Sequence, residues 1–216
     1  MAEGVKRRRP YRSAVREERG RRTKTQILEG ARALFLERGF AATTIAAIAD
    51  QAHVAPETIY ATYGTKAAVL ENVVLDAVLR DDGRHDVLER RWVRALLELP
   101  DLGGRIAAFA RHTAQTLELT SPVYAVIRAA GTGARELDDL QRRLQQKRFS
   151  DQAKVLVAVA RNQSLRAGLT AQEAAETFSA LASPELHHIL TADRGWSQDR
   201  YAQWLERTIE ATLLPP

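Results

Sequence analysis

The sequence of 216 residues contains no cysteine. Disulfide bonds, thiol catalysis and thiolate metal ligands are therefore excluded, and the absence of cysteine agrees with a reducing compartment. The sequence also has no run of 18 apolar residues, so we expect no transmembrane helix. The paired arginines near its start lack the hydrophobic stretch of an export signal. We predict a cytoplasmic protein that does not enter a membrane.

Motifs that would support catalysis are also scarce. The glycines at 103–104 and 131–133 lack the rest of a phosphate-binding fingerprint, and no strand pattern precedes them. No serine lies in a G-x-S-x-G frame. His53 stands alone, and the adjacent His187 and His188 point in different directions on a helix, so neither set favours a metal site. We therefore predict no enzymatic activity, no cofactor and no metal.

The most informative segment runs from residue 43 to residue 66. An apolar stripe recurs there at intervals of three and four residues, formed by Ile45, Ile48, Ala49 and Ala52. This spacing predicts a helix of about two turns, with Thr43 or Thr44 as its N-cap. The three residues 53–55 are too few for a structured loop. Pro56 fits the first turn of a second helix, because its missing N–H costs nothing there.

The second helix spans residues 56–63 and has two unlike faces. Ile59 and Tyr63 can pack inward, and Gly64 ends the helix. Thr65 then caps a longer helix. The outward face carries mostly small or hydroxylated side chains: Glu57, Thr58, Tyr60, Ala61 and Thr62. A short helix with such a face fits the major groove of DNA, although the same spacing also fits a plain helical hairpin.

Upstream, residues 25–38 form a further amphipathic helix that Gly39 ends, so three helices share one small core. Specific residues recur in combination along residues 25–70: Ala31, Phe35, Gly39, Phe40, Thr43, Thr44, Ile48, Ala49, Ala52, Val54, Thr58, Ile59, Tyr60, Tyr63, Lys66 and Leu70. This combination resembles the DNA-binding domain of the TetR family of bacterial transcriptional regulators. The resemblance implies a helix-turn-helix domain over 23–70, with a recognition helix at 56–63. It implies DNA contacts from Thr43, Thr44, Pro56, Glu57, Thr58, Tyr60, Ala61, Thr62, Tyr63 and Lys66.

The chain departs from the family pattern at two positions. His53 stands where the family often has glycine in the turn, which carries a modest cost in a left-handed conformation. Ala55 stands where the family often has a capping serine, so Pro56 and the acidic Glu57 must favour the helix start instead. Glu57 either discourages a wrong phosphate contact or accepts a hydrogen bond from a cytosine amino group.

Charge is concentrated at the start of the chain. Residues 1–24 hold ten bases and three acids, a net charge of +7, against +5 for the whole chain. We predict that residues 1–22 form a flexible basic arm that grips DNA phosphates or enters the minor groove. A solubility tail, or a contact with RNA or a membrane surface, fits the composition too. The basic DNA contacts that we expect here are Arg7, Arg8, Arg9, Arg21, Arg22 and Lys24.

Residues 71–216 are predicted to form a second, all-helical domain. After about residue 84 the pattern is helical almost throughout, without strand alternation, so the predicted fold class is all-α. Breaks are expected near 100–104, 121–122, 131–133, 168–170, 183–184 and 195–197. A long helix is predicted over 134–167, and the last helix carries Tyr201, Trp204 and Leu205 on one face. Each of these helices presents an apolar face that needs a partner.

The family resemblance implies that this second domain is a helical bundle that dimerises and encloses a small-molecule pocket. A homodimer would recognise a palindromic double-stranded operator, and an inducer would release it, which makes a repressor the expected function. The candidate pocket residues mix apolar and polar character: Phe109, His112, Tyr124, Ile127, Arg128, Phe149 and Phe178. Ordinary core packing explains the same residues equally well. A helical nucleic-acid-binding or interaction module without ligand control is the alternative function.

Overall fold

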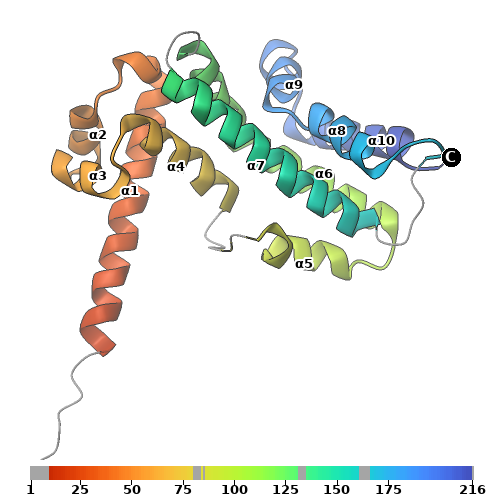
Figure 1. Cartoon of the computed structure of the whole chain (residues 1–216), viewed down its shortest axis with the longest axis horizontal. Helices are drawn as coiled ribbons and strands as arrows, with labels where there is room; N and C mark the ends of the chain where they lie inside the picture. The colour runs from red at the N-terminus through yellow and green to blue at the C-terminus, as the bar shows by residue number, and fades with distance from the viewer. Residues whose placement is uncertain (1–9, 80–83, 85, 131–134, 161–165, 216) are drawn as a thin grey trace, which may run out of the picture. The chain divides into compact units, whose positions relative to one another are not determined.

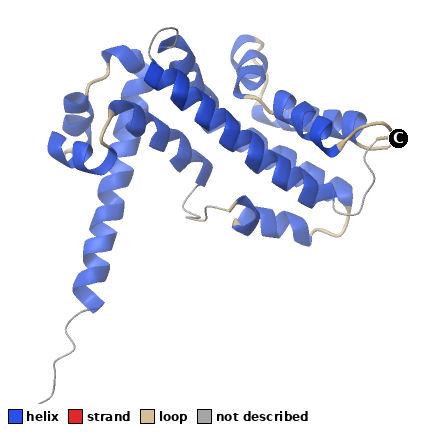
Figure 2. Cartoon of the chain, viewed as in Figure 1, coloured by secondary structure: helices blue, strands red, loops and turns tan. Residues whose placement is uncertain are grey.

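Every secondary-structure element of the described residues is helical, and no strand occurs among them (Figure 2). The computed structural model describes residues 10–79, 84, 86–130, 135–160 and 166–215. The all-α prediction is confirmed. By its internal contacts the chain divides into two compact units, Met1–Val73 and Val74–Pro216. No helix in the described ranges is long and apolar enough to cross a membrane.

The first unit contains α1 (Pro10–Ala42), α2 (Ile45–Ala52), α3 (Pro56–Tyr63) and the start of α4 (Lys66–Leu79). The C-terminal half of α1 packs against α2, and α2 packs against α3 (Figure 1). Helical spacing places one apolar residue per turn on the shared core. Its fully buried side chains include Ile27, Phe35, Ile48, Ile59 and Leu70.

Local capping explains where α2 and α3 begin and end. The Thr44 hydroxyl accepts a hydrogen bond from the Ala47 amide at 3.1 Å and caps α2. His53 ends α2 in the left-handed region, with φ 54°. Gly64 ends α3 with φ 77°, a conformation that suits glycine because it has no Cβ. The Thr65 hydroxyl then accepts from the Ala68 amide at 3.1 Å, as the sequence predicts for the next helix.

The start of α1 corrects one prediction. Residues 10–22, expected as part of a flexible arm, continue the helix that the apolar pattern places only from residue 25. Arginine, glutamate and alanine all favour helix, and Arg21 forms an ion pair with Glu18 three residues earlier. The N-terminal half of α1 extends past α2 and α3 as a single helix (Figure 1).

The second unit holds the remaining helical elements. They are η1 (Val87–Glu89), α5 (Arg91–Glu98), α6 (Leu102–Ala130), α7 (Arg135–Ala160), α8 (Ala171–Leu181), α9 (Pro184–His188), the π-helical turn η2 (Ile189–Asp193) and α10 (Gln198–Leu213). Helix α10 packs along α6, while α8 packs on α7. The core between them includes Phe109, Leu117, Phe178, Tyr201 and Leu205.

Helix α6 does not break at residues 121–122, contrary to the sequence-based expectation. Pro122 lies inside the helix, where it removes one backbone donor. Tertiary contacts of the same turn offset this cost: Ser121 is 1% exposed, and its Oγ lies 2.9 Å from Nδ1 of His187 in α9. A local breaker is therefore overridden by packing along the whole of α6.

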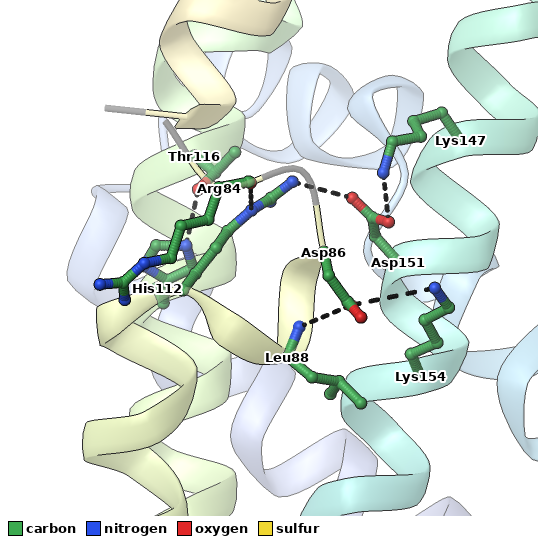
Figure 3. Close-up of polar contacts among 9 residues, drawn as sticks. Arg84, Asp86, Leu88, His112, Thr116, Lys147, Asp151 and Lys154 are labelled. Atoms are coloured by element: carbon green, nitrogen blue, oxygen red, sulfur yellow. Dashed lines mark hydrogen bonds and ion pairs between the residues drawn. The ribbon is translucent and has the colours of Figure 1, made fainter. Parts of the chain in front are cut away.

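A network of charged groups fastens η1 and the start of α5 to α7. Nη2 of Arg90, a residue only 4% exposed, donates to Oδ2 of Asp151 at 3.2 Å. Nζ of Lys147 donates to the other oxygen of Asp151 at 2.5 Å. Figure 3 shows Lys147 and Lys154 extending from α7 toward Asp151 and Asp86. The charge of the buried arginine is thus paired with a carboxylate.

Candidate nucleic-acid interface and effector region

Helix α3 presents an outward face that its own unit leaves open. Ile59 is fully buried and anchors the helix to the core. The next residue, Tyr60, points about 100° away around the helix and is 55% exposed, which is unusual for a large aromatic side chain. Glu57, Ala61 and Thr62 are exposed as well. Because Ile59 is buried, helical spacing leaves these predicted side chains of α3 exposed to solvent.

The remaining predicted α3 residues lie at the edge of this face. Pro56, Thr58 and Tyr63 are half-buried. The Thr62 hydroxyl donates to the Thr58 carbonyl at 2.7 Å, within the helix. Ala55 supplies no side-chain cap, as the sequence indicates, so backbone N–H groups at the start of α3 have no hydroxyl acceptor from their own N-cap.

Thr43 occupies a structural position and does not join the outward face. It is fully buried, and its hydroxyl donates to the carbonyl oxygens of Leu34 at 3.2 Å and Gly39 at 2.8 Å. The predicted DNA contact from Thr43 is therefore wrong. Thr44, its neighbour, is exposed at the N-cap of α2.

Lys66 also points into its own unit. Its Nζ donates to the carbonyl oxygens of Phe40 and Thr43, each at 2.7 Å, and lies 4.2 Å from the centroid of the Phe40 ring. These contacts occupy the ammonium group that we expected to meet a phosphate. The structure corrects that expectation: Lys66 ties the α1–α2 connection to the start of α4.

The basic residues of the N-terminal segment are placed only in part. Arg7, Arg8 and Arg9 lie outside the described residues. Arg22 and Lys24 are exposed on α1, and Arg21 is exposed beside Glu18. Arg21, Arg22 and Lys24 therefore lie on a helix rather than on an extended arm.

The candidate pocket residues of the second unit fall into two groups. The first is an aromatic stack: the Phe109 and Phe178 rings lie 4.6 Å apart. Trp92 of α5 stacks on His112 with ring centroids 3.7 Å apart and lies 6.2 Å from Phe109. Sequence reasoning missed Trp92, whose buried Nε1 has no hydrogen-bond partner among the described residues. The strongly amphipathic pattern of residues 91–98 was the available signal.

The second group surrounds the C-terminal half of α6. Tyr124 and Ile127 are buried, and Nη1 of Arg128 donates to Oε1 of Glu185 at 2.9 Å. Burial raises the pKa of Tyr124 to about 12, so the phenol is neutral at physiological pH. Arg148 of α7 approaches the same group and was also missed. The sequence signal for Arg148 was its position four residues after Leu144, which places a basic residue on an apolar stripe of the helix.

Phe149 joins neither group. It is half-buried and packs against the margin of the hydrophobic core. The seven candidate residues are thus not brought to one place, although Phe109, His112 and Phe178 are, and so are Tyr124, Ile127 and Arg128.

His187 forms a buried polar contact next to the second group. It is 3% exposed, its Nδ1 lies 2.9 Å from Ser121 Oγ, and its Nε2 lies 3.0 Å from Gln198 Oε1. Burial lowers the pKa of His187, although the Gln198 contact opposes this effect. The imidazole therefore joins α6, α9 and α10 in its neutral form at neutral pH.

A comparison with protein families identifies the first unit. Residues 27–73 match the family described as bacterial regulatory proteins of the tetR family. The first unit therefore carries the N-terminal helix-turn-helix domain of the tetR family. That family consists of DNA-binding transcriptional regulators and not of enzymes.

Solved structures of transcriptional regulators share the fold over most of the chain. A regulator from Rhodococcus sp. superposes with a TM-score of 0.67 at 18% identity, covering 88% of this chain and 98% of its own. NalD of Pseudomonas aeruginosa, the secondary repressor of the MexAB-OprM multidrug efflux pump, gives 0.66 at 21% identity, covering 91% and 98%. A Saccharomonospora viridis regulator in complex with choline gives 0.63 at 23% identity, covering 88% and 96%. No sequence among the curated proteins matches.

Proposed function

We propose that this TetR-family regulator is a homodimeric repressor that reads a palindromic operator through α3 and is released by a small-molecule effector. The observation that carries the proposal is the exposed face of α3, where Tyr60 is 55% exposed while the adjacent Ile59 is fully buried. Small and hydroxylated neighbours let such a helix approach base edges closely. The functional division is an N-terminal basic segment over 1–22, a DNA-binding domain over 23–70, and an effector and dimerisation domain over 71–216.

The comparisons support the finer parts of this proposal indirectly. NalD is named as a repressor, and the S. viridis regulator was solved with a bound small molecule. A two-fold dimer has a physical advantage, because two half-sites double the base contacts and fix the operator spacing. The operator lies on cytoplasmic DNA, so the proposed site of action is the cytoplasm.

A mutational test separates base reading from general stability. We expect Thr58→Ala and Tyr60→Ala each to raise Kd for the operator by about 5- to 150-fold at fixed salt, the range of one to three kcal/mol per lost base contact. Binding to unrelated duplex DNA is expected to stay the same. The operator is obtained by selection from random duplexes, and Kd by fluorescence anisotropy.

Leu36→Ala is the matched control. Leu36 is 41% exposed on α1 of the same unit, so its loss removes an exposed apolar side chain outside α3. Its Kd is expected to equal that of the wild type. If both α3 variants bind the operator with the wild-type Kd, the recognition helix is wrongly assigned. Preference for RNA over duplex DNA supports the alternative, a nucleic-acid-binding module without operator reading.

A further inference from the structure

Arg148 uses only one end of its guanidinium group within the second unit. Its Nη1 donates to Gln152 Oε1 at 3.1 Å and to the carbonyl oxygens of Ser179 and Ala182 at 3.0 Å and 3.3 Å. These three acceptors come from α7, from α8 and from the residue after α8. They hold the planar group in one orientation.

The opposite edge of the same guanidinium has no acceptor among the described residues. Nε of Arg148 is buried and has no hydrogen-bond partner among the described residues. None of the hydrogen bonds within the described ranges comes from Nη2. Nε–H and Nη2–H lie side by side and point in the same direction. This edge is the pair of donors with which arginine binds a carboxylate or phosphate through two parallel hydrogen bonds.

The charge of Arg148 is not balanced by a carboxylate in the way other charges of this unit are. Buried Arg90 is paired with Asp151 at 3.2 Å. Near Arg148 the available acid is Glu185, and its Oε1 accepts from Arg128 at 2.9 Å. The three groups accepting from Arg148 are neutral. A partly buried guanidinium is costly when the nearby acid is already paired with another arginine, and an anion would offset that cost.

Tyr124 adds a second donor on α6. Its side chain is buried, it interacts electrostatically with Arg148, and its hydroxyl makes no hydrogen bond to a described residue. Because burial raises the pKa of Tyr124 to about 12, the hydroxyl keeps its proton and donates to an anion. Tyr201 is different, since its hydroxyl already donates to the Leu181 carbonyl at 3.0 Å.

We propose that the effector of this regulator is an anion, whose carboxylate or phosphate group binds side-on to Nε and Nη2 of Arg148 and accepts from the Tyr124 hydroxyl. That the bound anion acts as an effector rests on the proposed function. The binding site itself rests on the geometry of Arg148. The proposal names the chemical class that the second unit recognises.

The test measures the thermal midpoint, Tm, of the full chain with probes at 10 mM and constant ionic strength. The probes are benzoate, its neutral counterpart benzamide, and inorganic phosphate. We expect either benzoate or phosphate to raise Tm by about 3 °C or more, and benzamide to leave it unchanged. A rise with benzoate alone identifies a carboxylate ligand, and a rise with phosphate alone identifies a phosphate ligand.

Three variants assign the response to this site. Arg148→Met is expected to abolish the rise in Tm, and Tyr124→Phe, which keeps the ring, to reduce it. Arg142→Met is the matched control, because Arg142 is an exposed arginine of the same helix paired with Asp139, and its rise should equal that of the wild type. Tyr124→Phe keeps the test decisive if Arg148→Met fails to fold.

The proposal is overturned if no anionic probe raises Tm above benzamide, or if folded Arg148→Met or Tyr124→Phe responds as fully as the wild type. Operator binding by the wild-type chain is measured separately. If the chain does not bind an operator but anions still raise Tm, the anion site is retained and the repressor function is wrong. If it binds an operator but no anion raises Tm, only the repressor function is retained.

Discussion

The ammonium group of Lys66 fixes the connection between α1 and α2 in the DNA-binding unit. It donates to the carbonyl oxygens of Phe40 and Thr43, each at 2.7 Å. We predict that Lys66→Met lowers the free energy of unfolding by about 2–3 kcal/mol, because hydrogen bonds from a charged donor are lost and the carbonyls are left buried. Urea denaturation followed by circular dichroism measures the change.

Lys24→Met is the control for this substitution. Lys24 is exposed on α1, so the free energy of unfolding is expected to change by no more than about 0.5 kcal/mol. If Lys66→Met keeps wild-type stability and instead reduces the salt dependence of DNA binding, Lys66 contacts a phosphate and the structural role is wrong.

The residues of α3 were predictable because the information is local. One buried position, Ile59, and a period of 3.6 residues place Tyr60 and Thr62 outside. Thr43 and Lys66 could not be placed this way. Their partners are carbonyl groups 4 to 26 residues away along the chain, and the apolar spacing within one helix does not predict such contacts.

At the scale of elements, the start of α3 is an uncapped helix end. Ala55 has extended backbone angles of φ −74° and ψ 142° at the N-cap, but its side chain accepts nothing. We predict that Ala55→Ser raises the free energy of unfolding by about 1 kcal/mol, because a hydroxyl there can accept from the amide two or three residues later. Urea unfolding measures the gain.

The converse substitution tests the contribution of an N-cap hydroxyl at the start of α2. Thr44→Ala removes the hydroxyl that accepts from Ala47 at 3.1 Å, so it should cost about 1 kcal/mol. A serine at 55 that leaves stability unchanged, while Thr44→Ala destabilises, would show that Pro56 and Glu57 already satisfy the start of α3.

From residue 10, where the described part begins, the basic N-terminal segment is helical. Residues 1–24 hold ten bases and three acids, a net charge of +7, which exceeds the whole chain's net charge of +5. We predict that deletion of residues 1–22 flattens the plot of log K against log salt concentration, by about 0.9 for each phosphate contact removed. Anisotropy titrations from 50 to 200 mM salt measure this slope, and an unchanged slope would exclude contact between this segment and DNA.

Helix boundaries were predictable where capping residues mark them and uncertain where they do not. Thr44, Pro56 and Gly64 fix the ends of α2 and α3. No such signal stands at residue 25, where the apolar stripe begins in mid-helix, so the upstream turns of α1 were read as an arm from their charge. Pro122 is the opposite case, a local breaker that contacts along α6 override.

At the scale of the whole molecule, the proposed repressor is a two-fold dimer that places two copies of α3 on one duplex. Two such helices can meet successive major grooves only when the half-sites repeat with the helical turn of DNA, about 34 Å or a multiple of it. Inserting five base pairs at the operator centre rotates one half-site by about half a turn. We predict that this insertion raises Kd by about 100-fold or more, whereas inserting ten base pairs costs less if the dimer can span the added turn.

The same DNA set distinguishes the dimer from independent monomers. Sedimentation equilibrium of the complex should give two chains per duplex, and each half-site alone should bind weakly. Equal affinity for the original and the five-base-pair operators would show that the two recognition helices bind independently. In that case the coupling between effector and operator could not work through helix separation, since an effector changes affinity only by favouring one of two arrangements that DNA distinguishes.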